Sequence, residues 1–107
     1  MTEASAKPMI TFVDEASARA LVDLVGIADA QVVKRNNFNG DQATWIVLAN
    51  IALSALPHII AYLKERRDCG KVKKIVFTAQ GGEKYEIENP TPEQLEDFHA
   101  QIKKTLS

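Results

Sequence analysis

One uncharged stretch in the middle of the chain carries the strongest structural signal: residues 42–63, which read QATWIVLANIALSALPHIIAYL. These 22 residues contain no Asp, Glu, Lys or Arg. When successive side chains are placed 100° apart, as in an α-helix, the apolar ones gather along one line. The residues on this line are Trp45, Leu48, Ala49, Ala52, Leu56, Ile59, Ile60 and Leu63. Asn50, Ser54 and His58 fall on the opposite side. The pattern therefore predicts one long apolar helix that ends at Gly70.

Such a helix has two interpretations. About 20 apolar residues can span a bilayer, so a small membrane-associated protein anchored through residues 43–63 is one alternative. We favour a core helix of a soluble domain, because a hydrocarbon environment offers no partner to a polar row unless another helix covers it. A continuous helix from Asp41 would be about 40 Å long. We therefore expect that Pro57 kinks it back over the sheet or that one part projects toward a partner.

The N-terminal third predicts a strand, a helix and a second strand. Residues 1–8 are small and polar and predict a flexible tail. The β-branched and aromatic residues of 9–13 predict a strand. Asp14 is placed to cap a helix, which Gly26 is placed to end. Residues 31–35 predict the second strand.

The C-terminal third predicts a β-hairpin followed by a helix. Residues 72–79 and 84–88 flank the loop 80–82, which contains the only glycine pair. A three-residue loop puts the apolar side chains of both strands on one face and the charged ones on the other. The apolar set is Ile75, Phe77, Tyr85 and Ile87. Residues 91–94, TPEQ, form a capping box with proline at the first helical position.

These elements predict an α+β fold in the order β-α-β-α-β-β-α. We expect a small, mostly antiparallel sheet with the helices, including the long apolar one, packed on one face. The chain has 107 residues, which suits a single domain over 9–107. The first eight residues contain no apolar leader, and together with the lone cysteine this favours a reducing cytoplasm.

Composition excludes several classes of function. The net charge of −1 gives no bulk attraction to nucleic acid or to an anionic membrane, so we expect neither as a partner. His58 and His99 are 41 positions apart, and the single Cys69 has no histidine near it in sequence. No spacing suits a metal site or a nucleophile with its base. We predict no catalytic, cofactor-binding or metal-binding residue and a protein that is not an enzyme. An unrecognised enzyme that uses His58 or Cys69 is a further alternative.

The charges are unevenly distributed along the chain. Residues 64–74 carry a local net charge of +4, and residues 83–97 carry −5. Such a division can steer a charged protein partner. Nucleic-acid binding would call for aromatic residues interleaved with the cations, and these are absent from the basic segment.

The second half of the chain resembles a known family. A long uncharged helix ends in the basic residues 63–67, LKERR, and a strand follows at once. A glycine turn at 80–82, QGG, then precedes a strand and a short helix that begins with 92–95, PEQL. This order over residues 41–107 is similar to the effector-associated constant component proteins of bacterial conflict systems. The resemblance implies a non-enzymatic partner of an effector and a signalling component, and it carries over no site residues.

We therefore expect a cytoplasmic protein–protein interaction module, an adaptor or an inhibitory accessory component, with no cofactor. The partner is a second copy of the chain, in a homodimer, or a different protein. The expectation depends on a long helix with more apolar surface than one sheet face can cover, because exposed apolar patches usually mark interfaces. The predicted contact residues are Ile46, Val47, Ile51, Tyr62, Arg66 and Arg67.

Overall fold

The computed structural model describes residues 8–25, 30–35, 43–49, 51–79 and 81–106, and these form three helices and five strands. In chain order the elements are β1 (Met9–Phe12), α1 (Glu15–Val25), β2 (Gln31–Arg35), β3 (Thr44–Leu48), α2 (Leu56–Asp68), β4 (Val72–Thr78), β5 (Lys84–Glu88) and α3 (Pro92–Leu106).

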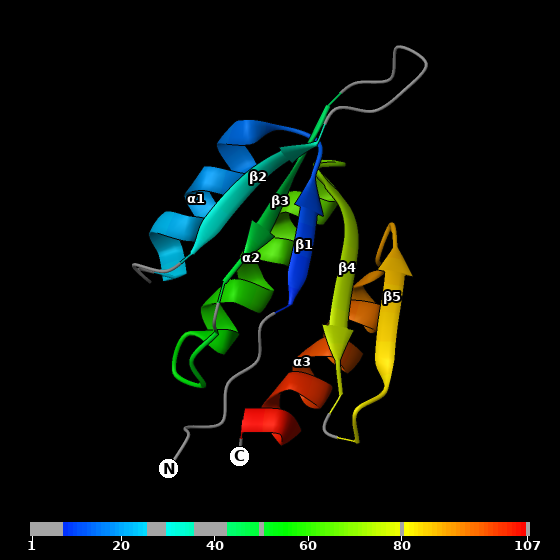
Figure 1. The fold of residues 1–107 in the computed structure, drawn as a ribbon. Coiled ribbons are helices and arrows are strands. Elements are labelled where there is room, and N and C mark those ends of the chain that lie inside the picture. The colour runs from blue at the N-terminus through cyan, green and yellow to red at the C-terminus, as the bar shows by residue number, and fades with distance from the viewer. Residues whose placement is uncertain (1–7, 26–29, 36–42, 50, 80, 107) are drawn as a thin grey trace.

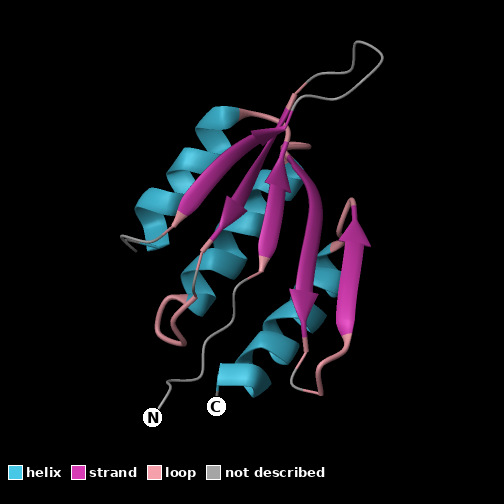
Figure 2. Ribbon diagram, viewed as in Figure 1, coloured by secondary structure: helices cyan, strands magenta, loops and turns pink. Residues whose placement is uncertain are grey.

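The five strands form one sheet in the order β2-β3-β1-β4-β5, and every neighbouring pair is antiparallel. All three helices lie on the same side of this sheet, so the molecule has one helical layer and one sheet layer (Figures 1 and 2). The predicted α+β class and the one-sided packing of helices are confirmed. The other face of the sheet has no covering element among the described residues.

The prediction of one long helix is wrong. Residues 44–48 form β3, an interior strand between β2 and β1, and the helix starts only at Leu56. The order is therefore β-α-β-β-α-β-β-α, with one strand more than predicted. The second half of the predicted apolar stripe does lie on a helix: the buried residues of α2 are Leu56, Ile59, Ile60 and Leu63. Trp45 and Leu48 belong instead to opposite faces of a strand, because successive strand residues alternate in direction.

The physical reason for the error lies in the environment of β3. The strand β3 has apolar side chains on its uncovered face, such as Ile46 and Leu48, as well as on its core face. It therefore lacks the alternation that distinguishes a strand from a buried helix. Pro57 is the residue that indicates where the helix begins. It lies in the first turn of α2, where its absent N–H has no helical partner to lose and its fixed φ suits the helix. Pro57 thus marks a helix start and not a kink.

The local predictions for the hairpin and the caps are confirmed. Phe77 pairs with Tyr85 and Ile75 pairs with Ile87, so the loop has three residues. The Ala79 N–H donates to the Glu83 carbonyl at 2.7 Å and closes this loop. Both predicted helix caps form, one at Asp14 and one at residues 91–94. The Ser17 N–H donates to Asp14 Oδ2 at 3.2 Å, and Thr91 and Gln94 each donate a backbone N–H to the other's side chain. Gly26 lies outside the described residues.

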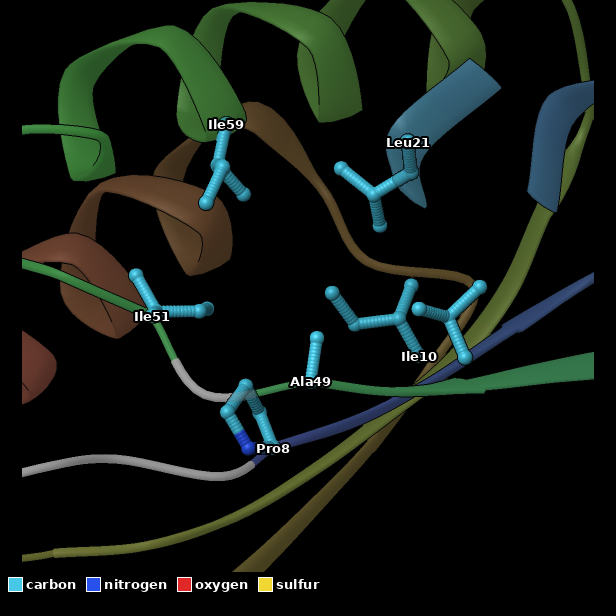
Figure 3. A pocket seen from close by; sticks show the side chains of 7 residues that line it. Pro8, Ile10, Leu21, Ala49, Ile51 and Ile59 are labelled. Atoms are coloured by element: carbon cyan, nitrogen blue, oxygen red, sulfur yellow. The ribbon is translucent and has the colours of Figure 1, made fainter. Parts of the chain in front are cut away.

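The core lies between the sheet and the helices. Its largest fully buried side chains include Phe12, Ile75, Leu63 and Phe98. A space of about 10 Å³ remains between β1, β3, α1 and α2, lined by apolar side chains such as Ile10, Leu21 and Ile59 (Figure 3). This volume is at the lower limit for a single water molecule, and the lining offers no hydrogen-bond partner. The interior therefore provides no ligand site there.

Two further expectations concern the membrane and the N-terminus. Within the part of the chain that the structure describes, no helix combines the length and the apolar composition needed to cross a membrane. The helix 43–63 on which the membrane alternative depended does not form. Residues 1–7 of the predicted tail lie outside the described residues. Pro8 is buried beside Ile10, so it packs with the domain.

Candidate interaction surface

The structure does not bring the six predicted contact residues onto one surface. Val47 and Ile51 are only 1% and 3% exposed and belong to the core, which corrects their prediction as contact residues. The sequence pattern placed Val47 and Ile51 on an exposed side because it treated residues 42–63 as one helix. In the strand β3, Val47 points toward the helices, whereas Ile46 points toward the uncovered face of the sheet.

The three predicted residues of α2 make contacts within the molecule. The Tyr62 hydroxyl donates to the Ser17 carbonyl of α1 at 2.6 Å, and its ring contacts Phe12 edge-on. The Arg66 guanidinium lies over the Tyr62 ring, 5.8 Å from its centre. Arg67 Nε donates to the carbonyl of Pro90 at 3.0 Å, which ties α2 to the segment before α3. Tyr62 and Arg67 therefore join α2 to other segments of the molecule, whereas Arg66 packs against its own helix.

The contact between Tyr62 and α1 predicts a pH dependence of stability. Burial raises the pKa of Tyr62 above its ordinary value of about 10. Between that value and the raised pKa, the folded protein keeps a phenol proton that the unfolded chain releases. Stability must therefore fall as pH rises through this range, and the contribution of Tyr62 is complete only below about pH 10. Tyr62→Phe should remove this slope and cost about 1 kcal/mol at pH 7, from the lost hydrogen bond.

Urea unfolding at pH 7 to 11 measures this effect in a Tyr85→Phe background, where Tyr62 is the remaining tyrosine. The background protein should lose stability at high pH relative to the same protein carrying Tyr62→Phe. Parallel stability curves for the two proteins would contradict the assignment.

Four of the six cations in the basic segment 64–74 form ion pairs, two of them with carboxylates of the acidic segment 83–97. Lys64 on α2 forms an ion pair with Glu96 on α3, and this hydrogen bond lowers the pKa of Glu96. Lys74 on β4 forms an ion pair with Glu86 on β5. Arg66 and Arg67 pair with the neighbouring Glu65 and Asp68. These charges therefore link α2 to α3 and β4 to β5, which leaves fewer of them to steer a partner.

The uncovered sheet face carries two rows of side chains that cross all five strands. The strand register sets both rows, because directly opposite residues point to the same face. The first row is Gln31, Leu48, Met9, Val76 and Glu86. The second row is Val33, Ile46, Thr11, Lys74 and Glu88. The middle of the face is thus mainly apolar, and Met9 and Val33 are 36% and 44% exposed.

A bulge in the sheet adds basic side chains at one end of this face. The register of β1 against β4 shifts between Thr11 and Phe12. Val72 and Ile75 both point into the core, so Lys73 and Lys74 both lie toward the uncovered face. These lysines, Arg35 and Ile46 line a shallow hollow of about 180 Å³. Among the described residues, neither Arg35 nor Lys73 has an ion-pair partner. We call this apolar surface with its basic end the open sheet face.

The structure places the candidate catalytic residues far apart. His58 lies in the first turn of α2, and Cys69 follows its last residue, so about 16 Å of helix separates them. Both side chains are exposed. Within the described ranges, no group of three or more His, Cys, Asp or Glu side chains could hold a metal ion. These two residues therefore form no nucleophile–base pair.

The geometry defines a two-layer α+β protein with an open-faced, five-stranded antiparallel sheet. Searches of protein families, curated proteins and solved structures find no match for this chain. The resemblance to the effector-associated constant component proteins remains a hypothesis.

Most residues of the open sheet face were missed by sequence reasoning. Ile46 was the only predicted contact residue that belongs to it. A signal existed for the β5 side, since Glu86 and Glu88 were placed opposite the apolar face of the hairpin. The contribution of Met9, Leu48 and Val33 follows only from the pairing of β1 and β2 with β3, which sequence patterns did not predict.

Proposed function

We propose that this protein is a non-enzymatic protein–protein interaction module and that the open sheet face is its contact surface. One observation carries the proposal: in the described part of the chain, helices cover one side of the sheet only (Figure 1), and the other side has apolar side chains at its centre. Antiparallel sheets often have one solvated face, but that face is then mostly polar. Met9, Ile46 and Val76 depart from this pattern at the centre of the sheet.

The charges on this face indicate the chemistry of the partner. Arg35 and Lys73 lie at one end, beside the apolar centre. A protein segment with apolar side chains and one or two adjacent carboxylates would match both features, because opposite charges at the rim orient a partner and speed its association. Each strand of the sheet is short, so the contact is of modest size and the complex is expected to be transient.

Site-specific photocrosslinking in the host tests the proposal. A photoreactive residue at Ile46 should capture a defined protein, whereas one at Ala61, exposed on α2, should not. The captured protein is then purified and titrated with variants. Ile46→Asp and Arg35→Glu should each weaken its binding at least about tenfold, and Ala61→Asp should leave the affinity unchanged.

Arg35→Glu keeps the test valid if Ile46→Asp proves unstable, because the Arg35 side chain is exposed. Equal affinities for the wild type and both face variants would overturn the proposal. If the resemblance to the effector-associated constant component proteins holds, the captured protein is an effector or a signalling component, and the chain is its adaptor or inhibitor.

A further inference from the structure

Among the described residues, no strand pairs with the outer side of β5, so this edge strand has unpaired backbone groups. The Glu83 carbonyl and the Asn89 N–H both bond to β4, through Ala79 and Lys73. Backbone groups alternate in direction along an antiparallel strand, so odd-numbered residues between these two also face β4. The N–H and C=O groups of Lys84, Glu86 and Glu88 therefore point away from the sheet. They form a template for one more antiparallel strand.

The residues of β5, KYEIE, are complementary to their own sequence in reverse. A two-fold axis through Glu86 would place Lys84 opposite Glu88 of a second copy, and Glu88 opposite Lys84. It would also place Tyr85 opposite Ile87 on the helical side of both sheets. In this register, the residues whose backbone groups point outward lie directly opposite one another. Each of the three opposite pairs can exchange two hydrogen bonds, so roughly six backbone hydrogen bonds could form.

The helical side of β5 leaves room for these apolar side chains. Helix α3 does not cover the strand completely, and Tyr85 is 41% exposed. A groove of about 430 Å³ lies between β5 and α3, with Phe77, Tyr85 and Ile87 on its apolar side and Gln94, Asp97 and Gln101 along the helix. In the two-fold arrangement, Tyr85 and Ile87 of each copy would cover those of the other.

The register brings only one pair of like charges together, the two Glu86 side chains. Like charges directly opposite each other destabilise a strand pair. Each Glu86 is already paired with Lys74 of its own chain, which offsets this repulsion. The other edge strand, β2, has no such match, because residues 31–35 contain two cations and no carboxylate. Charge complementarity therefore favours a second copy at β5 and not at β2.

We infer that two copies of this chain pair antiparallel along β5, with the two-fold axis at Glu86, and form a continuous ten-stranded sheet. A contact of five residues per strand is at the small end of protein interfaces, so the dissociation constant is expected to be in the micromolar range, about 1–100 µM. This inference does not depend on the open sheet face or on its partner.

A charge swap tests the inference by sedimentation equilibrium. Lys84→Glu would place a carboxylate opposite Glu88 of the other copy at both ends of the contact. This repulsion should raise the dissociation constant at least about tenfold. The double variant Lys84→Glu/Glu88→Lys restores both pairs and should dimerise within about threefold of the wild type. Lys103→Glu makes the same charge change on the side of α3 opposite the groove and should have no effect.

Cysteine crosslinking then tests the register in a Cys69→Ser background. Glu86→Cys should form an intermolecular disulfide, because hydrogen-bonded opposite residues are about 5.5 Å apart between Cα atoms, within disulfide range. Lys84→Cys alone should not link to its own copy, which would lie about 14 Å away along the strand. An equimolar mixture of Lys84→Cys and Glu88→Cys should link as a heterodimer.

A wild type that stays monomeric up to about 0.5 mM would overturn the inference. So would a dimer that is insensitive to Lys84→Glu, or one in which Lys84→Cys links as readily as Glu86→Cys. Ile46→Asp should leave the dimer intact. The proposal of a dimer at β5 and the proposal of a partner at the open sheet face can therefore be refuted separately.

Discussion

Replacing Phe98 with alanine is expected to lower the free energy of unfolding by about 3–5 kcal/mol, as for other fully buried aromatic residues. The Phe98 side chain has no exposed surface, and its ring contacts Phe77 of β4 edge-on at 5.0 Å between centres. It lies between Leu95 and Ile102, which are also fully buried side chains of α3. The substitution would leave a cavity where this helix joins the sheet.

This loss is large for a domain of this size. A chain of 107 residues is expected to have a total stability of about 5–15 kcal/mol, so Phe98→Ala would remove about a fifth of it or more. Urea denaturation followed by circular dichroism measures the change. Lys103→Ala, exposed on the same helix, serves as the control and should stay within about 0.5 kcal/mol of the wild type. A loss below about 1 kcal/mol would show that α3 does not anchor the core through Phe98.

The second large effect concerns β3. Ile46→Pro is expected to destabilise the fold by about 3 kcal/mol or more, because proline removes a ladder hydrogen bond and leaves a carbonyl of a neighbouring strand unsatisfied. Ile46 is opposite Thr11 on one side and Val33 on the other, so its backbone is enclosed by pairing. Ile46→Ala tests the side chain alone and should cost about 1 kcal/mol, since the side chain is half-buried on the open sheet face.

The matched experiment removes a natural proline. Pro57 lies in the first turn of α2, where proline is favourable, so Pro57→Ala should change stability by no more than about 1 kcal/mol. A proline in the middle of a continuous helix costs about 3 kcal/mol, and its removal would stabilise the protein by a similar amount. The denaturant midpoint of Pro57→Ala therefore distinguishes a strand followed by a helix from one long helix, whereas Ile46→Pro tests whether the backbone at this position is hydrogen-bonded. A Pro57→Ala variant stabilised by about 3 kcal/mol would contradict the structure, and so would a tolerated Ile46→Pro.

The open sheet face shows why the candidate surface was harder to predict than the fold class. Ile46 and Val47 are adjacent and chemically alike, yet one faces the open side and the other is buried. The period of the strand decides this, and the period could not be read from residues 45–49, which are all apolar. Tyr62 and Arg66 were also predicted from the sequence as residues that contact a partner. The hydrogen bond between Tyr62 and Ser17 joins α2 to α1 across 45 positions of sequence. Arg66 contacts the ring of Tyr62, which this packing holds in place.

Local chemistry by itself determined the parts of this protein in which interacting residues lie close along the chain. The cap at Asp14, the capping box at 91–94 and the register of the β4–β5 hairpin each depend on groups within a few residues of one another or on alternation over one turn. The tertiary structure alone decided that residues 44–48 are a strand and which sheet face stays open. Those features depend on pairing between β1, β2 and β3, and the hydrogen bonds between β1 and β3 join segments far apart in the chain, which local patterns do not show.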